Sequence, residues 1–172
     1  RIDGQWEGVD LPAQCVIKGL GEAVRTLVSL GVKVNECRPS GRFSSGTLMH
    51  AAVRGGRPEM LDLVASLGGD VAAYDEFMYT PLHLAAQEGE LSCVVKLAEL
   101  GADLERRDRF ERTALHDACW RNQAPVVFKL LCMGSNPWVV DVNGKTPLDI
   151  ALESPFLLRK GPAILRILAA TA

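Results

Sequence analysis

Three histidines and a neighbouring cysteine are the residues of this 172-residue chain whose types could do chemistry. His50, His83 and His116 could ligate a metal ion, and Cys119 follows His116 closely enough to suggest a nucleophile beside its base. The histidines recur at intervals of 33 residues, which gives each the same position in a repeated unit, on layers about 10 Å apart. Ligands that far apart cannot share one ion. We therefore predict that each histidine bridges a helix cap and neighbouring backbone, and that the chain has no catalytic residue, metal or cofactor.

The cysteines indicate a reducing environment. Their number is odd and no two form a CxxC pair, which argues against a disulfide framework and a zinc ribbon. We therefore expect an intracellular protein, cytoplasmic or nuclear. The three cysteines that follow helical patterns are expected to be buried apolar residues: Cys93, Cys119 and Cys132.

Composition excludes several classes of function. With 19 basic and 21 acidic residues, the net charge of −2 gives no overall attraction to nucleic acid, and glutamates interrupt the one candidate basic patch. No stretch approaches the roughly 20 apolar residues of a membrane-spanning helix, so we predict no membrane insertion. A P-loop and a dinucleotide-binding glycine motif are also missing, so we predict no enzyme. The start, Arg1–Gly4, offers neither a methionine nor an apolar signal core, and we expect a piece of a longer protein.

Two landmarks recur in phase along the chain. Threonines that open a first apolar run and glycines that follow a second apolar run are each spaced by 33 residues: Thr47, Thr80, Thr113 and Thr146, with Gly68, Gly101 and Gly134. Such a period indicates a stack of identical supersecondary units.

One unit can be built from local rules. Thr80 is a candidate N-cap, Pro81 suits the first helical position, and Gly89 ends the first helix. A second helix follows, and Gly101 supplies the left-handed residue after it. Two helices this short cannot bury their apolar faces alone, so neighbouring units must share a core.

The third unit carries the full pattern of a known family. Thr80-Pro81-Leu82-His83-Leu84-Ala85-Ala86, with Leu100-Gly101-Ala102-Asp103-Leu104, resembles the ankyrin repeat. The resemblance implies an all-α solenoid of helix-turn-helix units joined by finger loops. We expect one domain of five repeats, irregular at both ends, with insertions at 38–46 and 154–161: 5–37, 42–74, 75–107, 108–140 and 141–172.

The resemblance also implies where a partner binds. In this family the fingers and the solvent ends of the first helices line a concave groove. Large aromatics and arginines at such positions suit a protein or peptide that is acidic and has an apolar anchor. Alternatively, Phe77 and Phe110 stack on each other to stiffen the fingers. The expected partner-binding residues are Glu76, Phe77, Tyr79, Arg109, Phe110, Arg112, Trp120, Arg121, Asn143 and Lys145.

Three departures from the family pattern raise structural questions. Met78 and Glu111 stand where the finger usually has glycine, so these tips either avoid a positive φ or accept its strain. The loop 38–46 is basic and rich in serine and glycine. This composition fits a flexible finger loop, and it equally fits a loop that is phosphorylated or that a ligand orders. The last helix, near 163–170, is apolar almost all round and needs a cover, from Phe156–Leu158, a following domain or another chain.

The sequence therefore predicts a protein-protein interaction module without chemistry of its own. The alternative is a substrate-recruiting or regulatory arm of a larger enzyme, or of a ubiquitin-ligase adaptor, in the same polypeptide.

Overall fold

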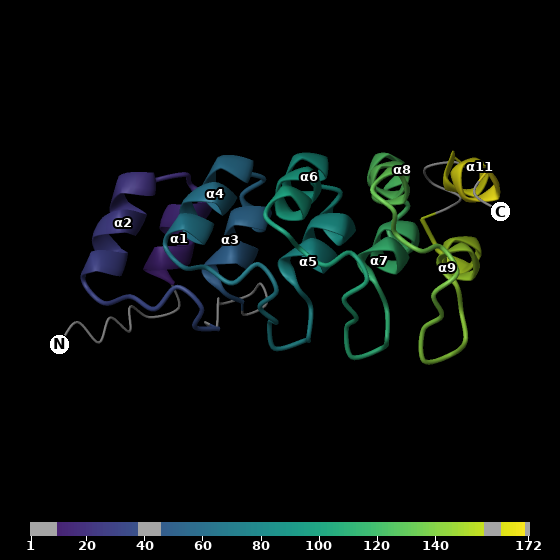
Figure 1. Ribbon diagram of the computed structural model, residues 1–172, viewed down its shortest axis with the longest axis horizontal. Coiled ribbons are helices and arrows are strands. Elements are labelled where there is room, and N and C mark those ends of the chain that lie inside the picture. Colours follow the sequence, from purple (N-terminus) through teal and green to yellow (C-terminus); the bar gives the residue numbers. More distant parts are fainter. Residues whose placement is uncertain (1–9, 38–45, 157–162, 171–172) are drawn as a thin grey trace.

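The computed structural model describes residues 10–37, 46–156 and 163–170, and within them the chain is a row of paired helices. Figure 1 shows the pairs side by side from the N-terminal to the C-terminal end, with the finger loops projecting from one side. The first helices of the pairs are α1 (Leu11–Ile17), α3 (Leu48–Arg54), α5 (Pro81–Glu88), α7 (Ala114–Trp120) and α9 (Pro147–Glu153). The second helices are α2 (Gly21–Ser29), α4 (Pro58–Ser66), α6 (Leu91–Glu99), α8 (Ala124–Cys132) and α11 (Ala163–Ala169). The all-α solenoid is confirmed.

The first helices begin where the sequence predicts. Thr47, Thr80, Thr113 and Thr146 are each the N-cap residue, in extended conformation, of α3, α5, α7 and α9. A capping box closes each start, because the side chain three residues later bonds back to the threonine. In the irregular first unit, Asp10 replaces the threonine and caps α1.

The core is shared between units. Leu82 and Leu115 of the first helices and Leu97 and Leu130 of the second helices are at most 2% exposed. Full burial of each such side chain contributes about 1.5 to 3 kcal/mol. Because α7 packs against α5 and α9 as well as its own partner α8, neighbouring helix pairs form this core together.

The three histidines tie each unit to the next finger. The Thr47 N–H donates to His50 Nδ1 at 3.2 Å, and His50 Nε2 lies 3.0 Å from the carbonyl oxygen of Tyr79. His83 and His116 repeat this geometry, their Nε2 atoms lying 3.0 and 3.3 Å from the carbonyls of Arg112 and Lys145. A carbonyl can only accept, so Nε2 donates, and Nδ1 accepts the threonine N–H, so the ring is neutral. The predicted structural role of the histidines is confirmed.

Asp149 fills the histidine position of the fifth unit. Its Oδ2 accepts from the Thr146 backbone N–H at 2.9 Å and from the Thr146 hydroxyl at 2.7 Å. A carboxylate can close the capping box, but it lacks the N–H group with which a histidine donates to the following finger.

Candidate functional site: the fingers and the ends of the first helices

A buried aspartate builds each finger. Asp75 Oδ1 accepts the backbone N–H groups of Phe77 at 2.8 Å and Tyr79 at 2.9 Å. Asp108 and Asp141 make the same two bonds, to the residues two and four positions later, in the next fingers. Each carboxylate is at most 7% exposed, so the fingers start from a rigid turn.

The finger tips accept backbone strain. Met78 and Glu111 adopt φ of 63° and 58°, in the left-handed region that non-glycine residues rarely enter. The strain costs about 1 kcal/mol at each tip. Of the two routes open to these tips, the chain takes the positive φ. Gly144 takes the same conformation in the next finger, at φ 73°.

Four side chains of two fingers form one exposed group, called here the finger cluster: Phe77, Arg109, Phe110 and Arg112. The Arg109 guanidinium lies 5.5 Å from the Phe77 ring centre and 4.8 Å from the Phe110 ring centre. The Arg112 guanidinium lies 5.3 Å from the Phe110 ring centre. The two phenylalanines are therefore linked through a cation, and 38% and 37% of their surfaces remain exposed.

The other expected residues on the fingers have separate surroundings. Tyr79 is half-buried and its ring centre lies 6.0 Å from that of His83. Lys145 forms an ion pair with Glu153. Glu76 and Asn143 are exposed near the tips of their fingers.

Trp120 and Arg121 lie at the far end of α7, away from its finger. The Ser154 hydroxyl donates to the Trp120 carbonyl, and the Arg121 guanidinium lies 5.5 Å from the Phe156 ring centre. Trp120 remains 36% exposed. Phe156, the first residue of one expected cover for the last helix, lies against Arg121, the C-cap residue of α7. Leu157, Leu158 and the loop 38–45 lie outside the described residues.

Asp117 is a residue of this surface that the sequence reasoning missed. It lies on α7 one turn before Trp120 and Arg121, is 6% exposed, and its Oδ2 is buried without a hydrogen-bond partner. Burial, reinforced by the charge of Asp108 and opposed by two arginines, raises the pKa of Asp117 to about 8. The available signal was the repeat itself, because the same position holds apolar residues elsewhere: Ala51, Leu84 and Ile150.

Comparison with known families identifies the architecture. Residues 13–108 match a family described as ankyrin repeats (3 copies), and residues 97–151 match one described as ankyrin repeats (many copies). The chain belongs to the ankyrin repeat family. Ankyrin repeats are generally protein-protein interaction modules and are typically non-enzymatic. Among curated proteins, none matches the chain significantly.

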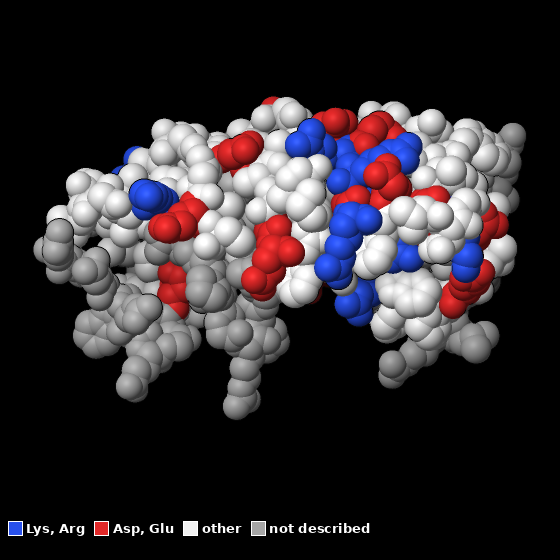
Figure 2. All heavy atoms as spheres, turned by 90° about the horizontal axis from the view of Figure 1, so that it is seen from below, with Lys and Arg blue, Asp and Glu red and all other residues white. Residues whose placement is uncertain are grey.

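The finger side of this ankyrin array carries mixed charge. Figure 2 views the molecule from that side and shows basic side chains gathered in the C-terminal half, with acidic side chains among them. Several pairs are direct, as between Arg107 and Glu111 at 3.1 Å. A surface of this kind offers individual cations rather than one broad basic face.

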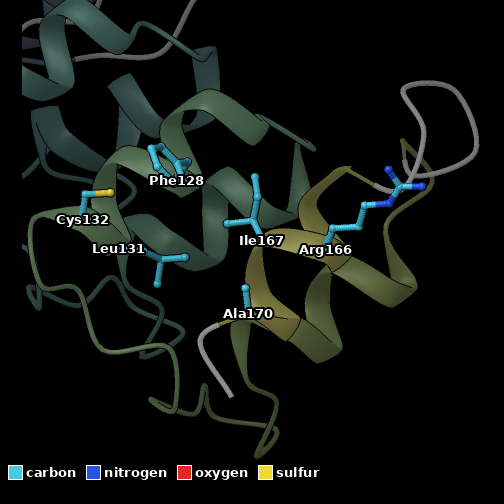
Figure 3. Close-up of a pocket in the computed structure, with 6 residues that line it drawn as sticks. All are labelled: Phe128, Leu131, Cys132, Arg166, Ile167 and Ala170. Atoms are coloured by element: carbon cyan, nitrogen blue, oxygen red, sulfur yellow. The ribbon is translucent and has the colours of Figure 1, made fainter.

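The end of the ankyrin array bears a second surface feature. In α11, Ile164 and Leu168 are buried, and the helix packs against α8 and α9. Between α8 and α11 an apolar groove of about 510 Å³ remains, where Phe128 and Leu131 face Ile167 and Ala170 (Figure 3). Neighbouring units thus cover part of the last helix, and the groove marks the part that is left open.

Cys132 corrects one expectation. It was expected to be buried, but it is exposed, beside this groove. Its position in the repeat is that of Glu99, which also faces solvent, so the register accounts for the difference. Cys93 and Cys119 are buried as predicted.

The part of the chain that the structure describes shows no other chemistry. Burial raises the pKa of the Cys119 thiol, which keeps it protonated and a poor nucleophile. Within the described ranges no three His, Cys, Asp or Glu side chains group as a metal site would require, and no described helix has the length and apolar character to cross a bilayer.

Proposed function

We propose that this ankyrin array binds a protein or peptide through the concave surface of its third and fourth repeats. The observation that carries the proposal is the finger cluster, in which one guanidinium lies against two exposed phenylalanine rings. Aromatic and arginine side chains dominate the energy of protein interfaces. Because buried turns hold both fingers, little side-chain or loop ordering opposes binding.

The chemistry of the cluster favours a segment with an apolar side chain next to an acidic one. The exposed edges of Phe77 and Phe110 would receive the apolar side chain. Arg112 already binds Asp141, its Nε lying 3.4 Å from Oδ2, whereas Arg109 contacts only rings among the interactions above. Arg109 is therefore the better candidate to pair with a carboxylate of the partner.

The remaining expected residues would form the rim of the same interface. Tyr79 and Lys145 flank the finger cluster, and Trp120 and Arg121 stand at the opposite ends of the helices. We place this binding inside the cell, because all five cysteines of the chain are free thiols.

The test uses peptides selected from a displayed library of random linear sequences on the purified array. Arg109→Ala, Phe110→Ala and Trp120→Ala are each expected to weaken a selected peptide by about 30-fold or more in calorimetry, since each removes an aromatic or arginine anchor. Added salt should also slow association if Arg109 meets a carboxylate.

Two matched controls lie on the second helices. Arg25→Ala and Phe128→Ala remove an exposed arginine from α2 and an exposed phenylalanine from α8, and neither should change affinity by more than about two-fold. The melting temperature of every variant must match that of the parent protein, so that a loss of affinity does not reflect unfolding. Selected peptides that bind the three finger-side variants as tightly as the parent would refute this site.

A further inference from the structure

Two carboxyl groups lie buried beneath the proposed binding surface. Asp117 is 6% exposed and Asp108 is 4% exposed, and the Oδ2 atom of each is buried without a hydrogen-bond partner. Asp108 is half satisfied, because its Oδ1 accepts the backbone N–H groups of Phe110 and Arg112. Buried polar atoms in folded proteins are nearly always paired, so these two orphaned oxygens require an explanation.

The position of Asp117 relates it to both sides of the proposed surface. It precedes Trp120 and Arg121 by three and four residues, so the three share one face of α7. Its charge also reaches the fingers: burial raises the pKa of Tyr79, and Asp117 and Asp108 raise it further. Asp117 therefore lies between the finger side and the helix-end side of the surface.

The nearby cations do not pair with Asp117. Arg112 directs Nε to Asp141 and lies over the Phe110 ring. Arg121 lies over the Phe156 ring, and its Nε is buried without a hydrogen-bond partner. Neither forms an ion pair with Asp117 in the described part of the chain, although both are close enough to act on its charge.

The fold itself does not require a carboxylate at this position. In the neighbouring units it holds Leu84 and Ile150, which are 8% and 3% exposed. Leucine would satisfy the same packing and avoid the cost of a buried unpaired acid. A residue that breaks the local rule without a compensating contact is expected at functional sites.

We propose that Asp117, supported by Asp108, is the anchor for a basic side chain, lysine or arginine, of the bound partner. This inference rests on the proposed function and adds a cation to the partner's apolar and acidic groups. A lysine or arginine beside Asp117 supplies the charge that this carboxyl group and the neighbouring charge of Asp108 favour. Amide and hydroxyl groups lack this charge complementarity.

Binding of a cation here carries a protonation signature. Because the pKa of Asp117 is raised to about 8, the carboxyl group is largely protonated at pH 7 before binding. A cation beside it lowers the pKa and expels the proton. Calorimetry at pH 7 in buffers of different ionisation enthalpy should therefore report proton release, and this release should vanish in Asp117→Asn.

The affinity test uses the peptides selected from the random library. Selected sequences should be enriched in lysine or arginine at one position, and replacing that residue by norleucine should weaken binding by about 30-fold. Asp117→Asn should cause a similar loss, and the two changes together should cost little more than either alone. Asp117→Leu is the second variant, since leucine already fits this position in repeat three, and Asp62→Asn on α4 is the matched surface control.

The outcomes separate this inference from the proposed function. Peptides that lose affinity with Arg109→Ala but not with either Asp117 variant overturn the anchor and leave the binding surface intact. Peptides indifferent to all of these variants overturn both. An Asp117-dependent peptide position that holds an amide or hydroxyl residue, or binding without proton release, also overturns the cationic anchor.

Discussion

At the scale of single residues, the chain departs from the ankyrin pattern or from its own repeat where the surface is proposed to bind. Met78 and Glu111 carry the positive φ of a glycine position, and Asp117 replaces an apolar residue beneath the groove. Each change costs stability without improving the packing. These losses of stability lie on two adjacent units, which indicates selection for a binding surface rather than for the stability of the fold.

The cost of Asp117 gives the first stability prediction. Asp117→Leu should raise the free energy of unfolding by about 2 kcal/mol or more at pH 7, because it removes a buried acid. The folded pKa of about 8 exceeds the unfolded value of 3.8, so Asp117 destabilises progressively as pH rises between these values. The advantage of the leucine variant should therefore grow between pH 5 and pH 8 in urea unfolding. An advantage that stays constant over this range would mean that Asp117 does not titrate there.

At the scale of elements, the histidines convert a helix cap into a link between units. Burial lowers the pKa of His50 to about 4, although the hydrogen bond to the Tyr79 carbonyl acts in the opposite direction. The neutral ring accepts from Thr47 and donates to Tyr79. Burial also lowers the pKa of His83 and His116. The same ring thus sets the start of one helix and holds the finger of the next unit.

These links predict a loss of stability in acid. The folded pKa of His50 lies below the unfolded value of 6.5, so its contribution is complete above pH 6.5 and is lost as pH falls toward 4. The loss from His50 is on the order of 3 kcal/mol. Asn cannot titrate, so His50→Asn should lose less unfolding free energy than the parent between pH 7 and pH 5. The variant must be compared with the parent at each pH, because Asp117 acts in the opposite direction. Equal losses in both proteins would contradict the assignment.

At the scale of the whole molecule, each helix pair is stabilised by packing against the adjacent pairs. Units in the middle of the row pack on both sides, and α7 contacts α5 and α9. The last helix, α11, packs on α8 and α9, with an apolar groove beside it. In a stack of this kind, an element with fewer neighbours opens first.

Hydrogen exchange should show this order. Amides of α11 are expected to exchange before those of α5, α6 and α7, because part of its apolar surface gains nothing from burial. Mass spectrometry on a monomeric sample measures this by segment. Slowest exchange in α11 would show that the groove is closed in solution.

The sequence by itself determined the period, and with it most of the fold. Caps, histidine bridges and finger turns follow from residues a few positions apart, such as Thr80 and His83, whose bonds repeat wherever the residues repeat. The register of the repeat alone could also have predicted that Cys132 is exposed to solvent. It could likewise have shown that Asp117 occupies an otherwise apolar position. Because these hydrogen bonds join residues a few positions apart, the sequence determines them with little influence from the tertiary structure.

Only the tertiary structure decided how side chains from different units meet. Arg109 lies between two phenylalanines that were equally able to stack, and Phe156 lies against Arg121. The same holds for Arg112 and Arg121, neither of which pairs with the buried Oδ2 of Asp117. The contacts of Arg109 with Phe77 and of Arg121 with Phe156 join residues about one repeat apart, and long side chains choose among several rotamers of similar energy. The choice depends on the spacing and twist of the stacked units, which no single repeat encodes.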